Sequence, residues 1–354
     1  MAQSDNANST RRPKATEERL DQIRREAAAT GGVPVASGGA GHAAPPVALP
    51  GKTDAAGSYY NLPVLKEPTW TWEVPLYFFL GGVAGVSSCI ALAAQFFSGD
   101  PALIRAALWM ALAGAAICPI LLIADLGRPS RFLNMLRVFK IQSPMSVGAW
   151  TLVAFSGCAF LAVLGNELVL RGFSSPLLVA MLWTGEISAA ATGLILASYT
   201  GVLVGATAIP VWSENRKLLP PHFLTSGLGS AAGILELVGF LTSATQILGL
   251  ISAGIETLIG GSIELRRRNV DIPLHYGKSG WFMRIAGTLE GPVALLLRII
   301  WHSYPIGRYA AAACFIAGAV ASRFAWIWAG RVSARDPHAL FQLQTGKANS
   351  SRPA

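Results

Sequence analysis

The sequence predicts an all-α polytopic membrane protein, with about eight transmembrane helices in two four-helix bundles and a disordered N-terminal tail. Only 13% of its residues are charged and 52% are hydrophobic, whereas a soluble domain carries about 25% charged residues. The mean hydropathy is +0.46. From Trp70 onward, apolar runs of about 20 residues, the length that spans a bilayer, follow one another with short interruptions.

The chain divides by composition into a tail, a membrane domain and a C-terminal tail. Residues 1–57 contain few large apolar side chains, which predicts a disordered polar segment. We expect the eight-helix membrane domain over residues 58–332. Residues 333–354 are again polar and form the predicted C-terminal tail.

The apolar runs give the position of each predicted span. We expect four spans in the first bundle, about 72–206, at residues 72–97, 102–124, 147–170 and 177–206. We expect four more in the second bundle, about 222–330, at residues 222–241, 244–265, 280–300 and 309–330. The seventh is interrupted by charges and Pro292 and could instead lie along the membrane surface. Pro119 predicts a kink in the second.

The basic residues predict an orientation rather than a nucleic-acid partner. The formal net charge is +9, but Lys and Arg gather in the tail and in alternate loops, as in cytoplasmic loops that face anionic lipid. We therefore expect a protein of the cytoplasmic (inner) membrane, in contact with lipid, with both termini in the cytoplasm and no nucleic-acid partner.

Cysteine and histidine usage argues against a bound redox metal. The four cysteines lie in different apolar runs without a CxxC pair, so we expect no iron–sulfur cluster and no metal site in this chain. Two haems would need four axial histidines within helices, and only His222 and His302 approach the spans. Electrons would have to come from a partner.

Alternating spans bring a set of polar side chains to one side of the membrane. Glu73, Asp125, Tyr199 and His222 fall on the same side, followed by the arginines after Asp125. Hydrogen-bond donors and a proton-exchanging group above an apolar bundle suit a quinone headgroup. Alternatively, Asp125 and Arg128 only fix a loop and Glu73 only caps a helix.

Three glutamates near the middle of predicted spans form a separate group. Charged residues inside a membrane are costly and usually functional. Glu236, Glu256 and Glu290 could therefore line a proton path. Equally, they could be protonated hydrogen-bond donors that hold the second bundle together.

One run of residues resembles a known family. Ile-Ala-Asp-Leu-Gly-Arg-Pro-Ser-Arg-Phe-Leu-Asn-Met-Leu-Arg at 123–137 is similar to the signature after the second span of the NrfD/polysulfide-reductase membrane-subunit family. Further similar pieces occur in order at 66–82, 143–150, 199–201 and 208–212. The resemblance covers about residues 59–330.

This resemblance implies a membrane anchor of a respiratory oxidoreductase complex, without haem, that is either non-catalytic or carries the quinone site and does no substrate chemistry alone. It would exchange electrons between a partner iron–sulfur subunit and membrane quinone, either menaquinone or ubiquinone. The partner would carry [4Fe-4S] clusters and would in turn serve a molybdopterin-type catalytic subunit. The residues carried over are Glu73 and Tyr199 for the quinone headgroup, and Asp125 with Arg128 for the supporting loop. Tyr77, which stands in the same region, and His222, which lies on the same side, complete the candidate quinone site, and Arg131 follows in the loop.

Three other roles stay open on the sequence. The protein could belong to a quinol-oxidising complex and move protons through its membrane glutamates. It could be a secondary transporter, given a weak internal repeat and intramembrane carboxylates. It could also be a passive anchor that binds no quinone.

Overall fold

The computed structural model describes residues 65–97, 99–126, 130–266 and 268–336, without the side chains of residues 130, 131 and 135. The chain divides into two units, Met1–Asn61 and Leu62–Ala354, and every described residue lies in the second. The predicted tail 1–57, Arg128 and residues 337–354 lie outside the described part. For Arg131, only the backbone is described.

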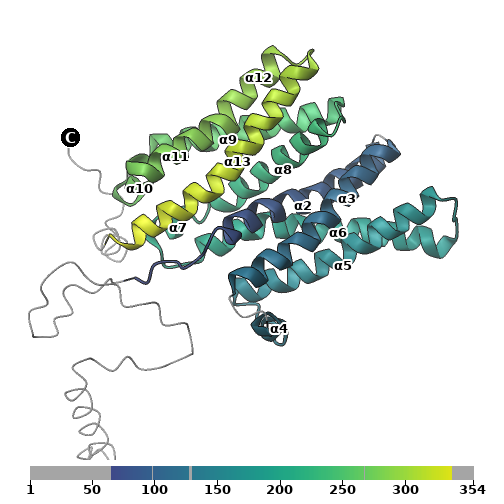
Figure 1. The fold of residues 1–354 in the computed structure, drawn as a ribbon, viewed down its shortest axis with the longest axis horizontal. Helices are drawn as coiled ribbons and strands as arrows, with labels where there is room; N and C mark the ends of the chain where they lie inside the picture. Colours follow the sequence, from purple (N-terminus) through teal and green to yellow (C-terminus); the bar gives the residue numbers. More distant parts are fainter. Residues whose placement is uncertain (1–64, 98, 127–129, 267, 337–354) are drawn as a thin grey trace, which may run out of the picture. The chain divides into compact units, whose positions relative to one another are not determined.

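The described residues form helices and no strands, which confirms the all-α prediction (Figure 1). The long helices are α2 (Glu73–Phe97), α3 (Pro101–Asp125), α5 (Pro144–Leu170), α6 (Pro176–Gly205), α8 (Leu219–Leu237), α9 (Ser243–Leu265) and α13 (Pro305–Ala334). The seventh predicted span is α11 (Gly277–Thr288), the π-helical turn η3 (Leu289–Val293) and α12 (Ala294–Ile300) in one continuous run. Short helices in the loops are α4 (Ser130–Leu136), α7 (Pro210–Glu214), η2 (Asn269–Asp271) and α10 (Ile272–His275).

Local sequence signals set most helix ends. Asp100, Ser143 and Ser175 accept hydrogen bonds from the first turns of α3, α5 and α6, each of which starts with proline. α8 ends four residues earlier than predicted, at Leu237. Gly239 has φ +114° and donates to Glu236, while Phe240 donates to Leu235, which is a Schellman stop that needs glycine.

Six of the described helices, α2, α3, α5, α6, α9 and α13, are long and apolar enough to cross a membrane, which makes the chain a multi-pass membrane protein. The other two predicted spans are not among these six, and the seventh is divided into shorter helices. α8 packs against α2, α6, α9 and α13, so protein rather than lipid covers its polar residues. Ser226, Ser230 and Glu236 are fully buried there.

The helices pack as two groups of four that meet along α8. α2, α3, α5 and α6 contact one another, as do α8, α9, α11–α12 and α13, and α8 lies against α2 and α6 (Figure 1). Small residues allow the closest approaches. At the crossing of α2 and α6, Gly85 faces Gly193, and a Cβ on either would overlap the other helix's backbone.

A side chain at this crossing should therefore destabilise the first bundle. We expect Gly85→Leu to lower the free energy of unfolding by about 3 kcal/mol, since overpacking forces the two backbones apart. Gly157→Leu on α5 is the matched control, because its Cβ would meet no atom within 4 Å. Thermal denaturation of the purified protein in detergent would measure both, and equal melting temperatures would contradict the assigned packing.

We call the end of the helices at which α2 begins the Glu73 side. Its loops are fastened by polar contacts: Asn215 donates to Asp271 over 2.9 Å, and Arg335 pairs with Glu67 over 2.6 Å. Burial raises the pKa of Asp271, partly offset by the Asn215 hydrogen bond. The Arg335 hydrogen bond lowers the pKa of Glu67. These contacts hold the ends of distant helices in a fixed order.

Candidate functional site

The first candidate site is a small cavity at the Glu73 side of the first bundle, which we call the tyrosine pocket. Its volume is about 80 Å³, and its lining is largely apolar. Tyr77 of α2 and Tyr199 of α6 are both buried in its wall, and Asp125 at the end of α3 also lines it. The remaining lining residues are Trp70, Val74, Phe78, Leu122, Leu126, Phe132, Met145, Gly148, Ala149 and Leu203.

The position of Tyr199 depends on a glycine in the neighbouring helix. A Cβ at Gly148 of α5 would overlap the Tyr199 ring, so the ring lies directly on the α5 backbone. Tyr77 lies on the facing helix and is only 2% exposed. Two phenols from different helices thus border one apolar space, and each can donate or accept a hydrogen bond.

Thr71 links the two carboxylates near this pocket. Its hydroxyl lies 2.8 Å from Asp125 Oδ1 and also hydrogen-bonds Glu73. Its backbone N–H donates to Asp125 as well. Asp125 lines the pocket, whereas Glu73 is not among its lining residues. Glu73, in the first turn of α2, is therefore connected to the pocket only indirectly, through the hydrogen bonds of Thr71.

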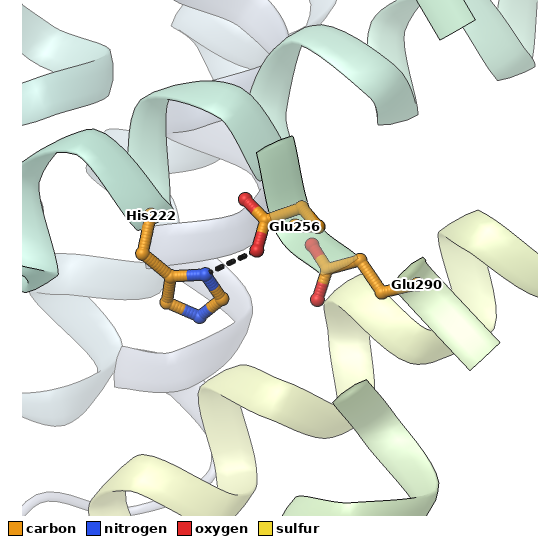
Figure 2. A group of neighbouring side chains, drawn as sticks. All are labelled: His222, Glu256 and Glu290. Carbon is orange, nitrogen blue, oxygen red and sulfur yellow. Dashed lines mark hydrogen bonds and ion pairs between the residues drawn. The ribbon is translucent and has the colours of Figure 1, made fainter. Parts of the chain in front are cut away.

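The second candidate site is a buried cluster in the second bundle, formed by His222, Glu256 and Glu290, which we call the His–Glu cluster (Figure 2). His222 Nδ1 lies 2.7 Å from Glu256 Oε2, and Thr225 donates to the other oxygen of Glu256. One ligand atom from each of the three lies within 4.8 Å of the others. The three residues are at most 5% exposed.

The π-helical turn η3 carries Glu290 in this cluster. Pro292 lies within the turn and has no N–H to donate, which favours a local break in the regular hydrogen-bond ladder. Gly318 of α13 packs directly on the backbone of this turn. Pro292 indicated in the sequence that the seventh span is interrupted. The sequence did not indicate the direction in which the Glu290 side chain would point.

A cavity of about 390 Å³ reaches the His–Glu cluster from the Glu73 side, between α9 and α11. Its walls are mainly apolar, and Glu264 and Arg284, 2.9 Å apart, stand at its rim. The inner end is formed by all three residues of the cluster. The cluster is therefore buried and lies next to open space.

The ligand types of the cluster could hold a metal ion, but its surroundings favour protons. Both oxygens of Glu256 already have hydrogen-bond partners. Arg323, 1% exposed, interacts electrostatically with Glu256 and Glu290, which disfavours a second cation nearby.

Glu236 lies apart from the other two glutamates with which the sequence grouped it. It is paired with Arg298 over 2.7 Å and with Arg308 over 2.6 Å, near the opposite side. Glu236 lies 14 residues after His222 on α8, which corresponds to roughly 20 Å. The grouping of Glu236 in one path with Glu256 and Glu290 is therefore corrected, because arginines hold it in a separate ion-paired network.

The predicted headgroup set is also divided. Tyr77, Tyr199 and Asp125 meet at the tyrosine pocket, with Glu73 beside it. His222 instead belongs to the His–Glu cluster, because it faces α9 rather than the first bundle. These residues all lie toward the end of the helices at which α2 begins, but that shared end alone does not specify the bundle.

Sequence reasoning missed several residues that complete these sites. Thr71 and Thr225 each hydrogen-bond a carboxylate of the site they belong to. Arg323 lies over the Phe223 ring, 3.9 Å from its centroid, and donates to the Phe223 carbonyl. A buried arginine was visible in the sequence, but its partner on another helix was not.

Comparisons with known proteins identify the family. The family model described as "Polysulphide reductase, NrfD" matches residues 63–247, more than half of the chain. The chain belongs to the NrfD family. Over 191 residues it is 29% identical to the C chain of polysulfide reductase from Wolinella succinogenes, covering 49% of this chain and 58% of that protein.

This membership confirms the family expected from the 123–137 run, and the match spans less than two thirds of that relative. The tyrosine pocket lies within the matched residues of the NrfD model, whereas Glu256 and Glu290 lie beyond them. The family likeness thus covers the whole tyrosine pocket but only His222 of the His–Glu cluster.

Proposed function

We propose that this chain is the membrane subunit of a reductase complex and exchanges electrons between a partner iron–sulfur subunit and membrane quinone. The observation that carries the proposal is the tyrosine pocket. Two phenols and a carboxylate from three helices border one apolar space at the Glu73 side. The family membership and the likeness to a polysulfide reductase subunit support it.

The chemistry of the pocket suits a quinone headgroup. Tyr77 and Tyr199 would donate to the two carbonyl oxygens, and Asp125 would exchange protons with water at the Glu73 side. The pocket volume of about 80 Å³ is small for the ring. The half-exposed Met145 lines the pocket, and its rotation would admit the headgroup while the isoprenoid tail follows the apolar wall.

The proposed partners dock on the Glu73 side. We infer an iron–sulfur subunit with [4Fe-4S] clusters in contact with this side and a molybdopterin-type catalytic subunit beyond it. The loop between α3 and α5 supports this, since Leu133, Phe139 and Ile141 are 70%, 56% and 78% exposed. Exposed apolar groups beside a pocket are typical of a protein interface.

The proposed location is the cytoplasmic (inner) membrane, with both termini in the cytoplasm. The support is the gathering of Lys and Arg in the loops of the Glu73 side, among them Arg216, Lys217, Arg266 and Arg268. The iron–sulfur subunit would then lie on the cytoplasmic side.

The test of the main proposal is Tyr199→Phe in the intact complex. We expect quinone turnover to fall by about 10- to 100-fold, because the donor to the developing charge on the quinone oxygen is lost. Reduction of a soluble dye by the partner subunits should be unchanged. Tyr304→Phe is the control, since Tyr304 is 65% exposed at the opposite side. Equal quinone kinetics in the two variants would contradict the proposal.

A second candidate function, proton movement, is favoured by the His–Glu cluster. Two of the three predicted glutamates, Glu256 and Glu290, converge on His222 at the inner end of a cavity that reaches toward the Glu73 side. Buried carboxylates and an imidazole beside a cavity can take up a proton from the side on which the cavity opens. With this function, the protein also takes up protons during quinone turnover.

A further inference from the structure

The cavity beside the His–Glu cluster is larger than the function proposed above requires. Its volume is about 390 Å³, against about 80 Å³ for the tyrosine pocket. Cavities that bind small molecules measure about 300–1,000 Å³, with apolar walls and a few convergent polar groups. Ile259, Ile263, Leu274 and Met283 form apolar walls here, and the His–Glu cluster supplies the polar end.

Three glycines leave the cavity open. Gly260 and Gly261 of α9 and Gly287 of α11 line it, and a Cβ on any of them would meet no atom within 4 Å. Helix packing does not require these glycines, unlike Gly85. Each glycine in a helix costs about 1 kcal/mol relative to alanine. Their combined effect is a flat gap between α9 and α11 that the protein does not fill.

The inner end of the cavity presents unused hydrogen-bonding atoms. Glu290 Oε1 and His222 Nε2 have no partner within the described part of the chain, although Glu290 is 1% and His222 5% exposed. Buried polar atoms normally have partners. An ionised carboxylate oxygen only accepts, so a ligand that satisfies Glu290 in this form carries a hydroxyl or another donor.

The rim indicates the route by which such a ligand arrives. Gly261 and Thr288 are exposed at the rim, and Leu258 and Leu265 on α9 are 74% and 85% exposed. These apolar side chains on a spanning helix face lipid. Neither leucine lines the cavity, but both lie on a helix that is long and apolar enough to span a membrane. A ligand that passes this apolar face is lipid-soluble.

We propose that this cavity is a second binding site, for a lipid-soluble hydroxylated ring of the hydroquinone class. The ring lies between the glycines of α9 and α11, and its hydroxyl donates to Glu290 while His222 faces it. A phospholipid fits less well, because its phosphate would lie near Glu256 and Glu290. The site shares its ligand class with the proposed function, but its residues are different.

The test uses a photoreactive hydroquinone analogue with the intact complex in membranes, followed by peptide mapping. We expect labelled peptides from 256–264 or 283–292, separate from any label at Tyr77 or Tyr199. Gly261→Leu should lower the second-bundle label by about tenfold, since the added side chain fills the gap. Gly254→Leu is the matched control. It lies on the same helix and has no atom within 4 Å of its Cβ, but it is outside the cavity, so it should keep the wild-type labelling.

Each outcome decides one point. Label at the tyrosine pocket without label in the second bundle would overturn this inference and leave the proposed function intact. Label in the second bundle alone would support this inference and contradict the tyrosine pocket as the quinone site. Displacement of the second-bundle label by excess phospholipid, but not by unlabelled hydroquinone, would assign the cavity to lipid and overturn the inference. If Gly261→Leu does not assemble, Gly287→Leu on the facing helix fills the same gap.

Discussion

Replacing Glu236 by glutamine is expected to destabilise the second bundle by about 3–5 kcal/mol. Glu236 and Arg298 are both 0% exposed, and the carboxylate lies between Arg298 and Arg308. Without it, two buried guanidinium groups would keep their charge and lose their counter-ion. Thermal denaturation in detergent should therefore show a large fall in melting temperature, with loss of the protein from membranes at growth temperature.

Two further variants separate this ion pairing from a general effect of losing a glutamate. Glu167→Gln removes the partner of Arg105, which is 54% exposed, and should change the melting temperature far less. Replacing Glu236 by leucine together with both arginines by methionine should recover much of the stability, because buried ion pairs often exchange for apolar residues without loss. A Glu236→Gln protein as stable as Glu167→Gln would refute the assigned network.

Glu290→Gln is expected to lower proton uptake from the Glu73 side by about 100-fold, the contribution typical of a positioned proton-transfer group. The amide keeps the shape of the side chain but cannot carry a transferable proton. Proton uptake would be followed with a pH-sensitive dye inside vesicles that contain the complex. Quinone turnover, measured in detergent on the same preparation, reports separately on the tyrosine pocket.

The control for Glu290 is Glu186→Gln. Glu186 is a carboxylate of equal burial, 1% exposed, on α6 of the first bundle, and it does not line the cavity of the second. It should leave proton uptake unchanged, and Glu290→Asp should retain part of it. If Glu290→Gln takes up protons at the wild-type rate, the His–Glu cluster has no part in proton movement.

The sequence was most informative where one local signal decides the outcome. Apolar runs of bilayer length predicted the bounds of α3, α5 and α6 to within three residues. In the structure, serine and aspartate caps and prolines at first helical positions set where these helices start. The end of α8 was misjudged because Gly239 adopts a positive φ, a choice that a run of apolar letters does not reveal. The 123–137 run was enough to indicate the family.

Side-chain partners were harder to predict, since they depend on the rotation of each helix about its axis. Residues three or four positions apart share a face, but which neighbour that face meets depends on packing. Glu236 and Glu256 both looked like membrane glutamates. One meets two arginines, and the other meets a histidine and a threonine.

The sequence by itself determined the class of protein and the family. Those properties depend on hydrophobic length and a local motif, both of which are written along the chain. Only the tertiary structure decided that His222 lies with Glu256 and Glu290 and not with Tyr77 and Tyr199. It also decided that glycines leave a cavity open beside the His–Glu cluster. Both depend on contacts between helices distant in sequence, whose rotation is fixed by the packing of the whole bundle.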